Sequence, residues 1–134
     1  RGDSMSRPYL GGSNAAIVSV TASTTLTNAD HGKTFLVGTD ALVVTLPATS
    51  KGISFSFINS GADGNNIITI SPAAADKIMG SIANAAQDNV AGASDDGDLV
   101  NTKASANKGD RVTLVGDGAD GWYITEGVGI WVGA

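Results

Sequence analysis

The chain has 134 residues, no cysteine, 8 basic and 13 acidic residues, and a net charge of −5. The absence of cysteine excludes a disulfide framework and thiolate metal sites. The acidic balance disfavours contact with phosphate backbones, and no run is long and apolar enough to span a membrane. We therefore expect neither a nucleic-acid nor a membrane partner.

The first 14 residues are polar and rich in glycine, without a sustained hydrophobic period. We interpret residues 1–14 as an extended N-terminal arm and residues 15–134 as a single β domain. Within the arm, the segment Arg7, Pro8, Tyr9 and Leu10 combines a positive charge with apolar side chains, so we expect it to contact another chain.

Short runs rich in Val, Ile, Thr and Phe alternate with turns of Gly, Asp and Asn from residue 15 onwards, as is typical of β-strands. The clearest strand is 53–59, which alternates Ile53, Phe55 and Phe57 with serine. The turns at 38–41, 60–65 and 116–121 predict hairpins. The expected strands are 17–20, 24–27, 34–37, 42–46, 53–59, 66–71, 111–115, 122–125 and 127–132.

Residues 73–109 differ in composition, because Ala, Asn, Asp, Ser and Gly replace the large apolar side chains. We expect a long irregular loop here, with a short strand at 99–100. The fold class that follows is all-β: an antiparallel β-sandwich or small β-barrel with an extended N-terminal arm and a long irregular loop.

No residue pattern marks a catalytic site. His31, the single histidine, lies in a turn, and the G-x-S-x-G pattern is absent. We therefore expect no catalytic residue, no cofactor and no enzymatic activity. A small hydrolase that uses aspartates is a weaker alternative.

Two acidic groups could supply oxygen ligands to a cation: one is Asp95, Asp96 and Asp98, and the other is Asp117 with Asp120. Neither meets the calcium-loop motif, so we favour a role as turn residues and expect no metal site. Cation binding by Asp95, Asp96 and Asp98 stays open.

A family resemblance rests on an ordered series of runs. They are ADHGKTFLV (29–37), VVTLPA (43–48), KGISFSFIN (51–59), IITI (67–70), DKIMG (76–80), KGDRVTLV (108–115) and WYI (122–124). This order resembles β-rich modules of tailed-bacteriophage virion proteins, namely capsid decoration or cement proteins, head fibres and parts of tail fibres. The resemblance covers about residues 24–132.

The resemblance implies a structural virion protein that is made in the host cytoplasm and lies on the capsid surface. It implies binding to the major capsid protein, stabilisation of the assembled shell, and a homo-oligomer, with a trimer favoured. The alternative is a fibre or receptor-binding module that recognises a host surface glycan or protein.

The C-terminal run 127–132 is expected to form a last, exposed strand. Its Ile130, Trp131 and Val132 join the arm residues as candidate interface residues, although Trp131 could equally belong to the core. Trp122 is expected in the core, with Tyr123 as its solvent-facing neighbour.

Overall fold

The computed structural model describes residues 16–82 and 97–134, so the predicted arm at 1–14 lies outside the described residues. The described part consists of short strands and two single-turn 3₁₀-helices. In chain order these are β1 (Ile17–Val20), β2 (Thr24–Thr25), η1 (Asn28–Asp30), β3 (Thr34–Val37), β4 (Leu42–Thr45), β5 (Ser54–Asn59), β6 (Ile68–Ser71), β7 (Lys77–Met79), β8 (Leu99–Asn101), η2 (Lys103–Ser105), β9 (Arg111–Gly116), β10 (Gly121–Val128) and β11 (Trp131–Gly133).

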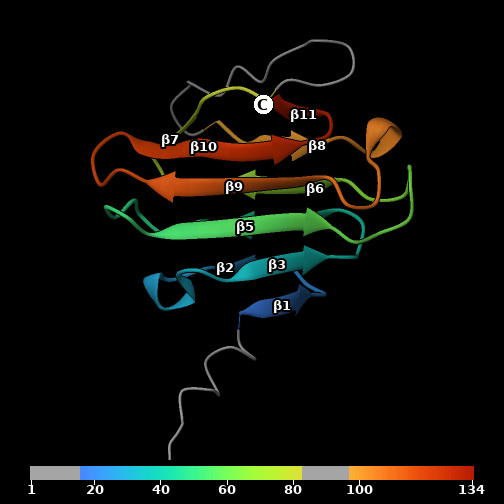
Figure 1. Ribbon diagram of the computed structural model, residues 1–134, viewed down its shortest axis with the longest axis horizontal. Coiled ribbons are helices and arrows are strands. Elements are labelled where there is room, and N and C mark those ends of the chain that lie inside the picture. Colours follow the sequence, from blue (N-terminus) through green and yellow to red (C-terminus); the bar gives the residue numbers. More distant parts are fainter. Residues whose placement is uncertain (1–15, 83–96) are drawn as a thin grey trace, which may run out of the picture.

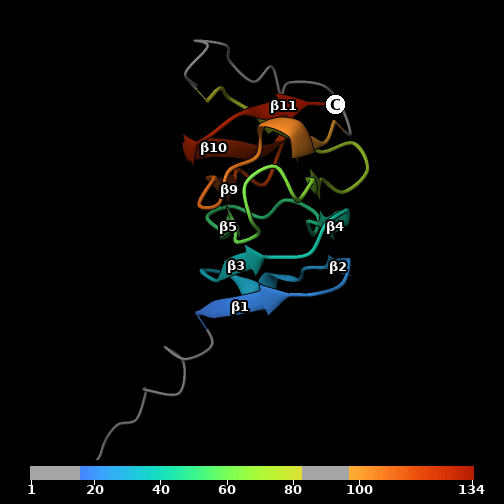
Figure 2. The ribbon, with the colours of Figure 1, turned by 90° about the vertical axis from the view of Figure 1, so that its right-hand side faces the viewer.

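The strands form two sheets. The six-stranded sheet has the order β1-β3-β5-β9-β10-β7, and the five-stranded sheet has the order β11-β8-β6-β4-β2. Figures 1 and 2 show the strands stacked from β1 and β2 at one end to β11 at the other. The predicted all-β class is confirmed.

The core is made by alternate residues of both sheets, as the period of two along a strand requires. In β5, Phe55 and Phe57 are buried and the intervening side chains are only half-buried. The Phe55 ring lies 5.4 Å from that of Trp122, centroid to centroid. Trp122 is fully buried and Tyr123 is exposed, as predicted.

The prediction of antiparallel pairing is wrong for the first half of the domain. β1, β3 and β5 pair in parallel, and so do β2, β4 and β6. Each connection along the chain therefore crosses from one sheet to the other. We call a unit of two such strands and their loop an arch. Three arches, β1–β2, β3–β4 and β5–β6, lie stacked on one another.

The hydrogen bonds of the loop at 38–41 explain why the chain forms an arch there and not the predicted hairpin. Asp40 Oδ1 accepts a hydrogen bond from the backbone N–H of Ile67 (2.9 Å), and the N–H of Ala41 donates to the carbonyl of Ile67 (3.1 Å). The loop is thus held by the next arch, far away in sequence. Gly and Asp favour a reversal of the chain in either case, so their composition does not reveal which sheet receives the following strand.

The second half is closer to expectation. β9 and β10 form the predicted antiparallel hairpin, and the predicted strand at 99–100 is confirmed within β8. The prediction of one long irregular loop over 73–109 is wrong in two places: β7 pairs in parallel with β10, and η2 forms a helical turn. Residues 83–96 lie outside the described residues.

Candidate functional site at the open ends of the sheets

Both sheets end together at β1 and β2. Among the described strands, β1 pairs only with β3 and β2 only with β4. The N–H of Thr34 donates to the carbonyl of Ala16 (2.7 Å). This bond shows which residues along β1 turn their peptide groups toward β3. In a parallel ladder alternate residues bond to the same neighbour, so the peptide groups of Ile17 and Ser19 point away from β3. The Ile17 side chain is 62% exposed. This edge can therefore accept another strand.

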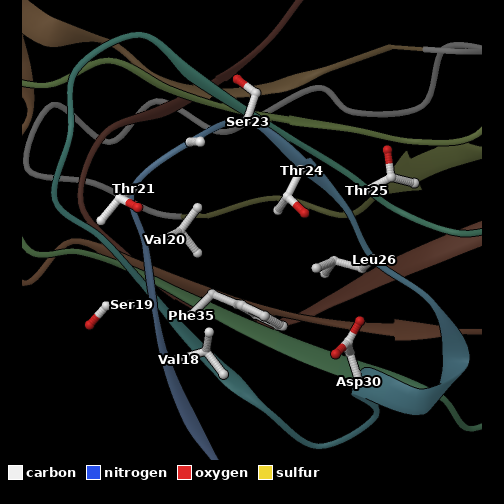
Figure 3. Close-up of a pocket in the computed structure, with 11 residues that line it drawn as sticks. Val18, Ser19, Val20, Thr21, Ser23, Thr24, Thr25, Leu26, Asp30 and Phe35 are labelled. Atoms are coloured by element: carbon white, nitrogen blue, oxygen red, sulfur yellow. The ribbon is translucent and has the colours of Figure 1, made fainter.

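A groove of about 340 Å³ lies between β1 and β2, and we call it the open-end groove (Figure 3). Val20 and Leu26 approach it from the two strands, and Phe35 of the next arch lies beneath them. Its lining residues are Val18, Ser19, Val20, Thr21, Ala22, Ser23, Thr24, Thr25, Leu26, Asp30 and Phe35. The groove is thus apolar at its floor, with Ser and Thr along its rim.

Asp30 brings a carboxylate to the groove, and Lys33 pairs with it. Its carboxylate accepts hydrogen bonds from Lys33 Nζ (2.9 Å) and from the N–H of Thr27 (3.0 Å). The hydrogen bond from Lys33 and then that from Thr27 hold the pKa of Asp30 below its ordinary value. The carboxylate is therefore ionised at neutral pH.

At the opposite end, β11 is the outer strand of the five-stranded sheet and pairs with β8. Asp98 and Ala134 extend this ladder to the last residue through reciprocal backbone hydrogen bonds of 2.7 and 2.8 Å. The Val132 side chain is 40% exposed, and Val128 at the end of β10 is also exposed. This end of the structure also combines an edge strand with exposed aliphatic side chains.

The candidate interface residues do not lie together. Arg7, Pro8, Tyr9 and Leu10 fall outside the described residues, and their contacts stay a prediction. Val132 is exposed, and Ile130 is half-buried. Trp131 is only 1% exposed, and its Nε1–H donates to the carbonyl of Val128 (3.0 Å). The structure places Trp131 in the core, so it is not an exposed anchor.

The expected single strand over 127–132 is also wrong. The chain bends at Gly129, where φ is +103°, and this bend separates β10 from β11. A Cβ on Gly129 would lie 2.3 Å from Cγ of Asp110. Glycine is required for both reasons, because only glycine tolerates this φ and this close approach.

Asp110 belongs to a buried polar network that is not among the predictions from the sequence. Asn59 Nδ2 donates to Asn101 Oδ1 (2.8 Å), and Asn101 Nδ2 donates to Asp110 Oδ2 (3.1 Å) and to the carbonyl of Ile130 (3.0 Å). The three polar residues are at most 5% exposed. They join β5, β8, the start of β9 and the bend before β11. A usable signal was that Asn59 and Asn101 continue the inward alternation of their strands.

His31 and Asp117 have structural roles. Nδ1 of His31 accepts a hydrogen bond from the N–H of Ser54 (3.0 Å), which ties its turn to β5. Oδ1 of Asp117 accepts from the N–H groups of Ala119, Asp120 and Gly121 at 2.8–3.0 Å. These bonds, led by that from Gly121, hold the pKa of Asp117 below its ordinary value. The carboxylate closes the β9–β10 turn.

The remaining chemistry-bearing side chains do not gather. Within residues 16–82 and 97–134, no three His, Cys, Asp or Glu side chains are grouped so that they could hold a metal ion. Asp95 and Asp96 lie outside the described residues. In the same described part, no helix has the length and apolar character needed to cross a membrane.

No protein-family model matches the chain, and no curated protein matches it in sequence.

Proposed function

We propose that this protein is a structural module that decorates and stabilises an assembled phage capsid by binding capsid subunits. The observation that carries the proposal is that, among the described strands, β1 and β11 are each the outer strand of a sheet and carry an exposed aliphatic side chain, Ile17 and Val132. Open edges attract partner strands through backbone hydrogen bonds, and exposed apolar side chains add contact area. The ordered sequence runs described above also support this proposal.

Binding to the assembled shell in preference to free subunits would stabilise the shell by mass action. Each copy would contribute a modest contact, and a symmetric oligomer, with a trimer favoured, would add avidity because its copies engage the shell together. The major capsid protein is the proposed partner, and the outer surface of the virion is the proposed location. His31 accepts a hydrogen bond from the N–H of Ser54, and Asp117 accepts three from its own turn, so both side chains hold turns.

The direct test uses particles assembled from the major capsid protein without this protein. Purified protein is added, bound copies are separated from free ones by sedimentation, and the temperature at which the shells disrupt is measured. We expect saturable binding and a higher disruption temperature. Absence of binding together with an unchanged disruption temperature would refute the proposal.

Edge variants locate the contact. Lysine on an edge strand opposes strand addition, so Ile17→Lys or Val132→Lys should weaken binding to the particles. Val43→Lys is the matched control, because Val43 is 38% exposed but lies on β4, between two paired strands. Equal binding by all three variants would show that neither edge is the contact surface.

The alternative is a fibre module that recognises a host glycan. One observation favours it: Tyr123 is 48% exposed on the outer face of the six-stranded sheet, in register with Val115 and, through it, with Ser54. An exposed aromatic ring on the face of a sheet suits contact with a sugar ring. Copy number per virion separates the two functions. Many copies spread over the shell favour decoration, whereas a few copies at one site favour a fibre.

A further inference from the structure

The open-end groove lies where one more strand of the five-stranded sheet would fit. Figures 1 and 2 show β2 at the level of β3 and β1 beyond both, so the six-stranded sheet reaches further at this end. The lining agrees. It includes Val18 of β1 and Phe35 of β3, but β2 is the only strand of the five-stranded sheet that contributes to it. Among the described strands, none lies beside β2 and opposite β1.

We propose that β1 of a second copy of this chain fills the groove, so that two copies join at their open ends about a twofold axis parallel to the strands. A twofold contact uses the same surface on both copies. Each β1 therefore lies beside β2 of the other copy, and both grooves are closed. The proposal goes beyond capsid binding and does not depend on it, and it leaves β11 as an open edge.

The strand directions suit this exchange. β1 and β2 run in opposite directions, as Figure 1 shows for β5 and β6, which are parallel to them. A twofold axis parallel to the strands exchanges the two sheets and keeps the direction of each strand. β1 of the second copy is therefore antiparallel to β2.

The backbone groups that face the second copy are free within one copy. The peptide groups of Ile17 and Ser19 point away from β3. The N–H of Leu26 donates to the carbonyl of Thr45 (2.8 Å). Alternation in the parallel ladder then turns the N–H and carbonyl of Thr25 away from β4. An edge residue of β1 and one of β2 can thus exchange two hydrogen bonds.

The link between β1 and β2 indicates which residues meet. It consists of residues 21–23, and equal steps from Ala22 at its middle bring Ser19 level with Thr25. The twofold axis then places Ser19 of the second copy directly beside Thr25. Residues that oppose each other in an antiparallel pair have their side chains on the same face of the sheet. Ser19 and Thr25 are both exposed, so they fit on the outer face.

The same register fits the apolar side chains. Val18 of the second copy lies beside Leu26, which is buried and therefore faces inward. Val18 is only half-buried within one copy, although it packs against the core. In the pair of copies, the two Val18 side chains enter the space between the sheets and cover the apolar floor of both grooves.

The charge distribution favours a second copy as the occupant. None of residues 16–29 is charged, and the nearest charges, Asp30 and Lys33, pair with each other at 2.9 Å. The whole chain has a net charge of −5, so two copies repel each other over much of their surface but oppose no like charges here. A charged partner would find no countercharge on these strands. By contrast, the edge strand β7 carries Lys77, a residue type that opposes strand addition.

The direct test exploits the absence of cysteine from the chain. In a hydrogen-bonded antiparallel pair the Cα atoms lie about 5.5 Å apart, within the disulfide range of roughly 4.4–6.8 Å. The double variant Ser19→Cys with Thr25→Cys should therefore form disulfides between two chains under mild oxidation. Within one chain these residues lie in sheets about 10 Å apart, too far for a disulfide. Non-reducing electrophoresis separates one chain from two.

The two single variants are the matched controls. Neither Ser19→Cys nor Thr25→Cys should link to itself, whereas an equimolar mixture should give linked pairs with one chain of each kind. Linkage of Ser19→Cys alone to the same extent would overturn the proposal and show that β1 pairs with β1. Absence of linkage in the double variant would overturn it as well.

Sedimentation equilibrium of the unaltered chain over a dilution series gives an independent measurement. We expect a reversible dimer. A monomer at all concentrations would overturn the proposal, and so would the trimer that the family resemblance favours. Ser19→Pro removes an N–H that faces away from β3 and should give a folded monomer by circular dichroism and sedimentation. A Ser19→Pro protein that stays dimeric would contradict the contact. No capsid is present, so these results are independent of the proposed function.

Discussion

The stacked arches and the C-terminal half of the molecule hold their strands in different ways, although both use Gly, Asp and Asn in their turns. In the arches, β1–β6, each strand pairs in parallel with a strand of the next arch, and the core side chains are aliphatic or aromatic. In the C-terminal half, β9 and β10 pair as a local hairpin, and a buried amide–carboxylate network joins the surrounding strands.

The two regions differ in where a loop aspartate finds its hydrogen-bond partner: within its own turn or in another arch. Asp40 and Asp117 are both loop aspartates whose carboxylates accept backbone N–H groups. Asp117 accepts from Ala119, Asp120 and Gly121 and so closes a hairpin, whereas Asp40 accepts from Ile67 and so holds two arches together. Variants in each half therefore test whether the two halves are held together in these different ways.

The largest effect is expected in the shared core. Trp122→Ala removes a fully buried ring that packs on Phe55, and we expect a loss of about 3–5 kcal/mol in the free energy of unfolding. Tyr123→Ala, at the exposed neighbouring position, should change stability by less than about 1 kcal/mol. Urea unfolding followed by circular dichroism measures both. Equal losses in the free energy of unfolding would contradict the placement of Trp122 in the core and of Tyr123 on the surface.

The bend between β10 and β11 comes next. Gly129→Ala forces a Cβ onto Asp110 and a positive φ onto alanine, so we expect a loss of about 2–4 kcal/mol. Gly32→Ala separates the two causes, because Gly32 has a φ of +80° and no atom within 4 Å of an added Cβ. It should cost only about 1 kcal/mol. Thermal unfolding of both variants checks this, and a similar small loss for Gly129→Ala would show that the bend can relax.

The buried network gives a smaller effect that is specific to the C-terminal half. Asn101→Ala leaves Asn59 Nδ2 without its acceptor and removes one donor each from Asp110 Oδ2 and from the carbonyl of Ile130, which should cost about 1–3 kcal/mol. Asn107→Ala, an exposed asparagine beside the network, is the control and should be near neutral. Chemical denaturation measures the difference. An Asn101→Ala protein as stable as the control would mean that water replaces the amide.

The smallest effects are electrostatic and concern the two loop aspartates. Lys103 first and Ile67 second hold the pKa of Asp40 below its ordinary value, whereas backbone N–H groups do so for Asp117. A lowered pKa in the folded state means stability that is present above the ordinary carboxyl pKa and is lost as the pH falls through the lowered value. In each of the variants Asp40→Asn and Asp117→Asn, Tm should decrease less as the pH is lowered.

Salt distinguishes these two aspartates. Because Asp40 forms an exposed ion pair with Lys103 at 2.6 Å, its contribution should shrink as ionic strength rises. The contribution of Asp117 comes from backbone hydrogen bonds and should respond less. Melting curves of the unaltered protein and of both variants at low and high salt test this. An identical salt response would contradict the two different roles.

The sequence predicts the strands well and their pairing only in part. Alternation in 53–59 correctly places Phe55 and Phe57 in the core, and the β9–β10 turn is recognised because all its hydrogen bonds are local. The arches are missed because the contacts that define them, such as Asp40 with Ile67, join distant residues. The sequence does not decide whether Trp131 belongs to the core or to an interface, because its burial depends on the bend at Gly129.

The claim that edge strands bind a capsid shell is tested most directly by a cryo-EM map of decorated particles. We expect many copies over the shell surface, with β1 or β11 seated against the major capsid protein. A map in which both edges face solvent, or in which the protein occupies a few copies at one fibre, would contradict it.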